Sequence, residues 1–419
     1  MPFDASFLYE SVNWADNSAI HQLFAQMRAE EPVHFCESDT YPDLWHVTKH
    51  ADIFDVERRT NDFLNEPRLI IWSREVEAGV RAQTGGSLNT IRSLVTYDAP
   101  EHMKLRLLTQ AWFMPKNLKK LQPKIEASIQ RGLSEIEARN GACDFAVNVA
   151  TEFPLRVIMD VLGVPEGDYA MMLRLTQELF GPDDPDTQRE VEEGVSARAA
   201  ADQTRLELFS YFTALTKVKM ENPQDDVGSI IANAEIDGQP LDDMSKLGYY
   251  VIVATAGHDT TSYSLTEAVY QLAQNPDLLE RLKADPETIA PLITEEAIRY
   301  AAPVRHFIRT AAHDTTLGDK TIREGESVIL WYPSGSRDES LFENPHVFNI
   351  DRDMSTRHAA FGHGAHMCLG MHLARQEITA FLKAFSKRVS AVNLTGEPKY
   401  VQANFVGGIK SLPIAIKLD

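Results

Sequence analysis

The chain has 419 residues, of which 43% are apolar and 24% are charged, and no tract is compositionally biased. Its length alone predicts two or three domains, because single hydrophobic cores stop growing at about 250–300 residues. The formal net charge of −20 argues against nucleic acid or an anionic membrane as a general partner.

Neither a membrane span nor a secretory signal is evident. No stretch approaches the ~18 consecutive apolar residues of a transmembrane helix. The segment MPFDASFLYESVNWADN lacks the basic and apolar regions of a signal peptide. Cys36, Cys143 and Cys368 form an odd, sparse set, which is typical of a reducing compartment. We therefore expect a cytoplasmic protein with no membrane partner.

In chain order, two short strand-like segments come first, PVHF (32–35) and DLWHVTK (43–49), with turn-forming residues between them. From Asp98 to Lys283 the apolar residues mostly recur at helical spacing, with breaks at 181–186 and 222–226. Further β-like segments follow at 327–333 and 411–418. The pattern predicts a mainly α protein with a minor β part.

The segment DAPEHMKLR (98–106) reads as the start of a helix. Asp98 and Glu101 have the spacing of a capping box, and Pro100 falls in the first turn. His102 and Arg106 then lie one turn apart on the same face. Taken alone, Arg106 is typical of a surface arginine.

Residues 248–257 (GYYVIVATAG) lead into AGHDTT at 256–261 and predict a buried helix with polar residues at its centre. Gly257 costs such a helix about 1 kcal/mol relative to alanine. A threonine hydroxyl here can bond the carbonyl one turn earlier and bend the helix. The segment is either a satisfied polar kink or a functional site.

Glu296 and Arg299, in EEAIRY (295–300), lie three residues apart on one helix face. An ion pair at this spacing is, by itself, typical of a solvated surface.

Residues 358–374 (HAAFGHGAHMCLGMHLA) place Phe361, Gly364, Cys368 and Gly370 in the spacing F-x-x-G-x-x-x-C-x-G. Apolar residues at helical spacing follow, so Cys368 is predicted at the start of an amphipathic helix. Free N–H groups and the helix dipole there favour a thiolate over a thiol. The glycines allow the backbone to pass close to a flat partner.

Two alternatives apply to this loop. One is a buried structural cysteine at a tight turn. The other is a zinc site built from His358, His363, His366, Cys368 and His372. Structural zinc sites bring paired ligands at short spacing from two separate places, which this single cysteine does not do. Neither alternative explains the combination of aromatic, glycine and cysteine residues, and we favour a thiolate ligand.

With these residues, the sequence resembles the cytochrome P-450 family. The ten-residue cysteine-loop signature is matched in full, and 98–106, 256–261 and 295–300 agree in the family's order. The resemblance runs from about residue 98 to the C-terminus. It implies one domain over 1–419, mainly helical with a small sheet. Haem b would lie between the acid–alcohol helix and the cysteine-ligand loop.

The resemblance also implies residue roles. Cys368 is the axial ligand of the iron, and its thiolate favours O–O cleavage. Asp259 and Thr260 are the acid–alcohol pair that delivers protons. Glu296, Arg299 and Arg352 are structural. Further cofactor contacts are His102, Arg106, Arg309 and His366 at the propionates, Phe361 beside the ligand loop, and Ala256 and Gly370.

The implied reaction is hydroxylation of a small hydrophobic substrate with dioxygen. No flavin or iron–sulfur module fits in the chain, so a small ferredoxin with its reductase is the expected electron donor to a monomeric enzyme. Four lysines form a basic cluster that is either its docking patch or a solvated helix face. They are Lys116, Lys119, Lys120 and Lys124.

Several stretches resemble the terpineol-hydroxylating branch of the family, which implies a monoterpene or an alkyl-substituted aromatic as substrate. We expect the pocket walls to include Ile71, Trp72, Val253, Val304, Phe307 and Phe405. His258, beside the acid, is polar where the family often has an apolar residue, and whether it tunes proton delivery is left open. The alternative functions are a peroxide-driven haem-thiolate oxygenase and a non-catalytic haem-binding sensor.

Overall fold

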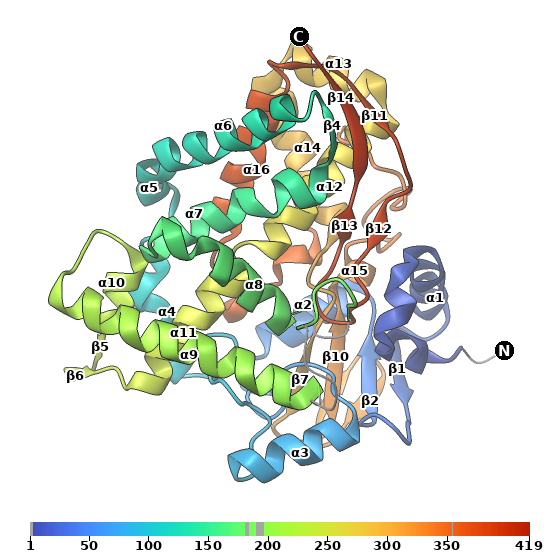
Figure 1. Cartoon of the computed structure of the whole chain (residues 1–419). Helices are drawn as coiled ribbons and strands as arrows, with labels where there is room; N and C mark the ends of the chain where they lie inside the picture. The colour runs from blue at the N-terminus through green and yellow to red at the C-terminus, as the bar shows by residue number, and fades with distance from the viewer. Residues whose placement is uncertain (1–2, 181–183, 190–196, 354) are drawn as a thin grey trace.

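The computed structural model describes residues 3–180, 184–189, 197–353 and 355–419. A helical body fills the left and centre of Figure 1, and a sheet with the first helix lies at its right. The expected mainly α architecture with a minor β part is confirmed. Of the break expected at 181–186, residues 181–183 lie outside the described part of the chain, as do residues 190–196 after it.

The α-helices follow the chain from blue to red in Figure 1. They are α1 Asn17–Glu30, α2 His50–Arg58, α3 Arg74–Thr84, α4 Glu101–Gln110, α5 Pro115–Leu118, α6 Gln122–Ala138, α7 Glu152–Leu162, α8 Tyr169–Phe180, α9 Ala197–Glu221, α10 Val227–Ala232, α11 Asp243–Ala256, α12 Asp259–Gln274, α13 Pro276–Ala284, α14 Pro286–Ala301, α15 Tyr332–Gly335 and α16 Met371–Phe385.

The larger sheet has the strand order β1-β2-β10-β7-β3. Its strands are β1 Val33–Cys36, β2 Leu44–Val47, β3 Phe63–Leu64, β7 His306–Ala311 and β10 Ser327–Trp331. β10 pairs parallel with β2 and antiparallel with β7, where Val328 lies opposite Arg309. This register holds Arg309 on a central strand of the sheet.

Smaller β elements complete the fold. β14 Pro413–Leu418 lies between β11 Val389–Leu394 and β4 Ala142–Asp144. Three two-stranded pairs are β5 Glu235–Ile236 with β6 Gln239–Pro240, β8 Thr315–Leu317 with β9 Lys320–Ile322, and β12 Lys399–Tyr400 with β13 Ile409–Ser411.

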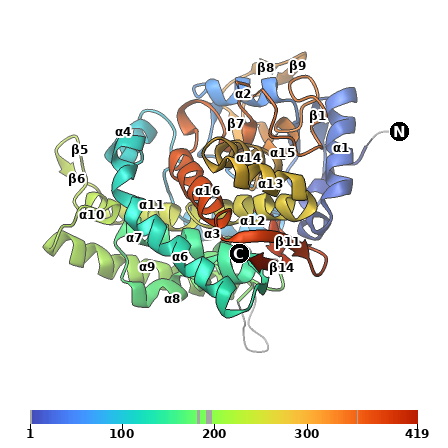
Figure 2. The same cartoon turned by 90° about the horizontal axis from the view of Figure 1, so that it is seen from above.

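Two helices at the centre have apolar stripes with the spacing that helical packing requires. α12 buries Leu265, Ala268, Val269 and Leu272, at positions i, i+3, i+4 and i+7. α16 repeats the pattern with Ile378, Phe381, Leu382 and Phe385. Each fully buried Leu, Ile or Phe contributes about 1.5–3 kcal/mol. The stripes join the largest core cluster and hold both helices in place. In Figure 2, α12 and α16 lie near the centre of the molecule.

The sequence-based strands agree with the structure except at their ends. The segment expected at 327–333 is a strand only to Trp331, because Tyr332 begins the one-turn helix α15. β7 and β11 were not predicted. Every residue of β7 except Phe307 is buried, so the strand has no clear polar–apolar alternation to reveal it.

Candidate active site

The central helix is interrupted between α11 and α12, at Gly257 and His258. Thr260 Oγ1 donates to the carbonyl oxygen of Ala256 at 3.1 Å, one turn earlier, as the sequence predicts. A Cβ on Gly257 would lie 2.4 Å from Ile158 Cγ1, so α7 packs directly against this break. The interruption is therefore built into the packing of the helices.

Asp259 begins α12 and is buried, with a relative exposure of 5%. Burial raises the pKa of its carboxyl, and the neighbouring His258 opposes that shift. His258 Nε2 lies 3.2 Å from Asp259 Oδ1. Thr260 lines the cavity described below, whereas Asp259 lies behind that wall.

The cysteine loop is closed by a hydrogen bond from the backbone N–H of Cys368 to the carbonyl oxygen of Phe361, at 2.8 Å. Gly364 has a φ of 67°, and a Cβ there would lie 2.3 Å from the carbonyl oxygen of Glu57. Only glycine fits this close approach without strain. The loop is thus pressed against α2.

The Cys368 side chain faces the cavity and is exposed to it, although protein surrounds it on its other sides. Burial raises the pKa of its thiol, while the N–H groups of Gly370 and Met371 and the nearby Arg106 and Arg375 lower it. These two N–H groups stand at the start of α16, two and three residues after the cysteine. The helix-start environment expected for a thiolate is present.

One internal cavity joins the loop to the helix break. It encloses about 1580 Å³ of empty space, its open mouth included. Cys368, Gly370 and Phe361 line one side, and Ala256 and Thr260 line another. A Cβ on Gly370 would meet no protein atom within 4 Å.

Four basic residues line the same cavity: His102, Arg106, Arg309 and His366. The rings of His102 and His366 stack with centroids 3.8 Å apart. Burial and the nearby arginines lower the pKa of His102 to about 4 and that of His366 to about 2. Both imidazoles are therefore neutral here, and the cluster carries the positive charge of two arginines.

These arginines are poorly neutralised by protein groups. Arg106 Nη2 donates to the carbonyl oxygen of Met367 at 2.8 Å, and Arg309 Nη2 lies 3.9 Å from Glu57 Oε1. Burial raises the pKa of Glu57 to about 7, so this carboxyl gives Arg309 only a partial counter-charge. The cavity thus combines apolar walls, a thiol and an uncompensated cationic edge, which fits a flat apolar cofactor with carboxylate arms and a thiolate-bound iron.

Sequence reasoning missed the groups that support this edge. Asn65 Nδ2 lies 3.0 Å from His366 Nε2 and donates to Asp98 Oδ1 at 2.9 Å. The capping box expected at Asp98 and Glu101 is wrong, because Asp98 accepts from Asn65 and from the backbone N–H of Glu66 instead. No local pattern links residues 65, 98 and 366, so only the folded chain reveals this contact.

The expected apolar walls divide into two groups. Val253, Val304, Phe307 and Phe405 line the cavity. Ile71 and Trp72 do not line it. Ile71 is buried in a separate core cluster, where its N–H donates to His306 Nε2 at 3.2 Å. Residues that line the cavity but were not predicted include Leu94, Val95, Phe113, Ile158, Ile252 and Val406.

The histidines near Cys368 have other partners. His363 stacks on Phe54 with centroids 4.4 Å apart, and His358 Nε2 lies 3.1 Å from Glu295 Oε1. Within the described ranges, the side chains of His, Cys, Asp and Glu form no group of three or more that could hold a metal ion by themselves. The contacts of these histidines do not support the zinc alternative.

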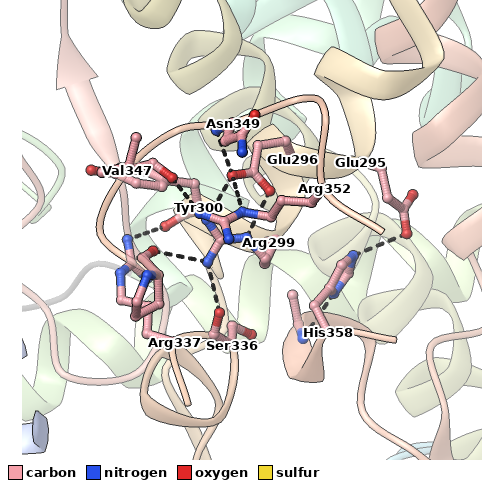
Figure 3. A network of polar contacts seen from close by, with 12 residues as sticks. Glu295, Glu296, Arg299, Tyr300, Ser336, Arg337, Val347, Asn349, Arg352 and His358 are labelled. Atoms are coloured by element: carbon pink, nitrogen blue, oxygen red, sulfur yellow. Dashed lines mark hydrogen bonds and ion pairs between the residues drawn. The ribbon is translucent and has the colours of Figure 1, made fainter. Parts of the chain in front are cut away.

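Glu296, Arg299 and Arg352 form one buried network, drawn in Figure 3. Arg299 Nε and Nη2 donate to the two Glu296 carboxylate oxygens at 2.7 Å each, and Arg352 Nε donates to Oε1 at 3.0 Å. Arg299 also donates to the carbonyl oxygen of Ser336 at 2.8 Å. The network joins α14 to the chain that leads into the cysteine loop.

The four lysines of the basic cluster lie at α5, α6 and the turn between them. Lys120 pairs with Asp225 at 2.8 Å and Lys124 with Asp160 at 2.9 Å. Lys116 and Lys119 are exposed and have no ion pair within the described residues. The cluster is therefore about half neutralised. Arg375, near the cysteine, is paired with Glu295.

The chain was compared with known proteins. A sequence model of the family described as cytochrome P450 matches residues 288–390. Cytochrome P450-terp from a Pseudomonas species is 40% identical over 405 residues, covering 96% of this chain and 94% of that protein.

Among the described residues, no helix is both long and apolar enough to cross a membrane.

Solved structures agree with the sequence comparison. The crystal structure of CYP108D1 from Novosphingobium aromaticivorans superposes with a TM-score of 0.92 at 39% identity, covering all of both chains. CYP268A2 from Mycobacterium marinum, solved in complex with pseudoionone, has a TM-score of 0.88 at 30% identity and covers 99% of each chain.

Proposed function

The chain belongs to the cytochrome P450 family of haem b-dependent monooxygenases, and we propose that it hydroxylates a small apolar substrate with electrons from a ferredoxin. The observation that carries the proposal is the shared cavity between Cys368 and the break at Thr260. Haem bound there supplies the redox chemistry that activates dioxygen, so that one oxygen atom enters the substrate and the other leaves as water.

We assign Cys368 as the axial thiolate ligand of the iron. The first N–H groups of α16 and Arg106 would stabilise the thiolate against burial, which raises the pKa of the thiol. His102, Arg106, Arg309 and His366 would hold the propionates. Their shared edge, with two arginines that lack close carboxylate partners, supports this assignment.

Asp259 and Thr260 would move protons into the cavity. Thr260 lines the cavity, and its hydroxyl is oriented by its bond to the Ala256 carbonyl oxygen. Asp259 is buried next to it, and burial raises the pKa of its carboxyl, which favours the protonated form that a proton donor needs. The pair therefore suits a relay from the protein interior to the cavity.

The substrate would be a compact apolar molecule, such as a monoterpene or an alkyl-substituted aromatic. Val253, Val304, Phe307 and Phe405 offer an apolar surface with few hydrogen-bonding groups. The complex of a similar protein with pseudoionone favours the terpenoid class. Such walls select by shape, so closely related molecules should differ only modestly in affinity.

Electrons would come from a ferredoxin docked beside the cysteine loop, in the cytoplasm. α4 reaches this loop through Arg106 and Met367, and two exposed lysines lie nearby, Lys116 on α5 and Lys119 in the turn after it. In a chain of net charge −20, a local positive surface would guide an acidic partner.

The test is a spectrum followed by a titration. The reduced protein with carbon monoxide should show the strongly red-shifted Soret band of thiolate ligation, and Cys368→His should lose it. Monoterpene alcohols and alkylbenzenes should then shift the ferric spectrum on binding. Turnover should require a ferredoxin and its reductase. Equal turnover with peroxide alone would favour the peroxide-driven alternative, and a histidine-type band would overturn the assignment of Cys368.

A further inference from the structure

His258 lies at the helix break and contacts two other elements of the site. Its side chain is fully buried, with a relative exposure of 0%. Nε2 lies 3.2 Å from Asp259 Oδ1 and 3.2 Å from Thr176 Oγ1. Thr176 belongs to α8, drawn in green in Figure 1, whereas Asp259 starts the yellow α12. One imidazole nitrogen thus bridges two helices.

The contacts of Thr176 decide which nitrogen of His258 carries the hydrogen. The Thr176 hydroxyl donates to the carbonyl oxygen of Met172 at 2.8 Å, and a second helix carbonyl lies at 3.0 Å. Because its single hydrogen is used within α8, Thr176 Oγ1 must accept from His258. Nε2 is therefore the protonated nitrogen: its N–H donates to Thr176, and Nε2 also lies in close contact with Asp259 Oδ1, at 3.2 Å.

The other nitrogen supports this assignment. His258 Nδ1 is buried and has no hydrogen-bond partner among the described residues. A bare acceptor nitrogen without a partner costs less than an orphaned N–H group. In the Nε2–H form the single ring hydrogen bonds Thr176 Oγ1, and Nε2 remains 3.2 Å from Asp259 Oδ1.

Asp259 has few other groups to hold it. Within the described part of the chain, His258 is the only basic side chain within 4 Å of its carboxylate. A carboxylate at the first residue of a helix can take several rotamers unless a partner fixes one of them. The imidazole, itself held by α8, is that partner.

We infer that His258 is a positioning residue, which fixes the Asp259 carboxylate for proton delivery and is itself anchored on α8 through Thr176. The inference rests on the proposed role of Asp259 and Thr260. It adds a residue that touches neither the cavity nor the substrate, since His258 does not line the cavity. It also gives α8 a direct contact with the proton-delivery pair.

Matched variants of the haem-loaded enzyme test the inference. The measured quantity is the coupling ratio, which is product formed per NADH consumed with ferredoxin and reductase present. His258→Met removes the N–H at similar volume, and His258→Gln restores a donor near the Nε2 position. We expect Met to lower the coupling ratio about tenfold and Gln to remain within about twofold of the wild type. Equal coupling in both variants would overturn the inference.

Thr176 provides a second pair that keeps His258 in place. Thr176→Val removes the anchoring hydroxyl at similar volume, and Thr176→Ser keeps it. We expect Val to lower the coupling ratio about threefold and Ser to leave it unchanged. If His258→Met fails to bind haem, this pair decides the question. A Val variant that couples as well as the Ser variant would then contradict the inference.

NMR spectroscopy tests the contact between His258 and Asp259 without enzyme turnover. In ¹⁵N-histidine-labelled, reduced, carbon monoxide-bound enzyme, the His258 signals are identified by their loss in His258→Gln. They should report a protonated Nε2 and a bare Nδ1, and Asp259→Asn should shift the Nε2 resonance. A protonated Nδ1 would overturn the proposed geometry.

Asp259→Asn distinguishes the proton-delivery role of Asp259 from the positioning role of His258. If it leaves the coupling ratio unchanged, the proposed proton-delivery role fails, and the role of His258 fails with it. If Asp259→Asn uncouples the enzyme and His258→Met does not, only the positioning role is wrong. In the Asp259→Asn background, His258→Met should cause no further loss.

Discussion

Thr260 Oγ1 donates to the carbonyl oxygen of Ala256 at 3.1 Å across the break between α11 and α12. The bond occupies a carbonyl that the helix break leaves available, and it points the hydroxyl at a cavity that Cys368 also lines. A local helix distortion and a distant cysteine thus meet at one site.

Thr260→Ala should uncouple the enzyme. Without the hydroxyl, protons reach the cavity less directly, and general acid–base groups typically contribute about 10²–10⁴-fold to the steps they assist. We expect the product formed per NADH to fall about tenfold or more, with a smaller change in NADH consumption. Thr260→Ser keeps the hydroxyl and is the control. Coupled turnover in the alanine variant would remove Thr260 from the mechanism.

Glu296→Ala should strongly destabilise the fold. The change leaves Arg299 and Arg352 charged without their common carboxylate, and Arg299 is only 2% exposed. Breaking a buried pair in this way costs about 3–5 kcal/mol. The free energy of unfolding from urea titration measures the loss.

A matched control is the two-point pair of Arg281 and Asp351, whose side chains are 44% and 62% exposed. Asp351→Ala should cost about 0–1 kcal/mol. Similar losses in the two alanine variants would show that burial does not determine the importance of Glu296.

Gly257→Ala should destabilise the helix break by overpacking. The new Cβ would lie 2.4 Å from Ile158 Cγ1 and 2.7 Å from its Cδ1, so α7 or α12 must move. Such overpacking costs about 1–3 kcal/mol. Gly167→Ala, where a Cβ meets nothing within 4 Å, should change the unfolding free energy by less than about 0.5 kcal/mol. A fully stable Gly257→Ala variant would contradict the close packing.

His46 should make stability depend on pH. It is fully buried, its Nδ1 accepts from Trp331 Nε1 at 3.0 Å, and its Nε2 lies 2.6 Å from the Tyr9 hydroxyl. Burial lowers its pKa from 6.5 to about 3. Below pH 6.5, His46 is therefore protonated in the unfolded chain but stays neutral in the folded protein. Stability is lost as the pH falls from 6.5 towards 3.

One such proton corresponds to about 1.4 kcal/mol per pH unit. In His46→Gln, the unfolding free energy between pH 6 and pH 4 should fall less steeply than in the wild type, by about this amount. Urea titrations at several pH values measure the difference. Parallel pH profiles for the two proteins would show that His46 is not the responsible group.

The sequence by itself determined the features that depend on short spacings. The stripes of α12 and α16 follow from residues three and four apart, and the apolar spacing after Cys368 predicted the helix that begins at Met371. The bond from Thr260 to Ala256 was also predictable, because the two residues are only four positions apart in the sequence. Residues three or four apart lie on the same face of any helix, so a sequence pattern is enough to predict these contacts.

The tertiary structure alone decided which distant segments meet. In the folded chain Asp98 accepts a hydrogen bond from Asn65 and does not cap the helix, and Thr176 contacts His258. Ile71 and Trp72 do not line the cavity. These pairings join residues tens to hundreds of positions apart, and their free energy depends on packing that no single segment encodes. Burial acts in the same way, because the raised pKa of Asp259 and the lowered pKa of His46 arise only when the whole chain surrounds them.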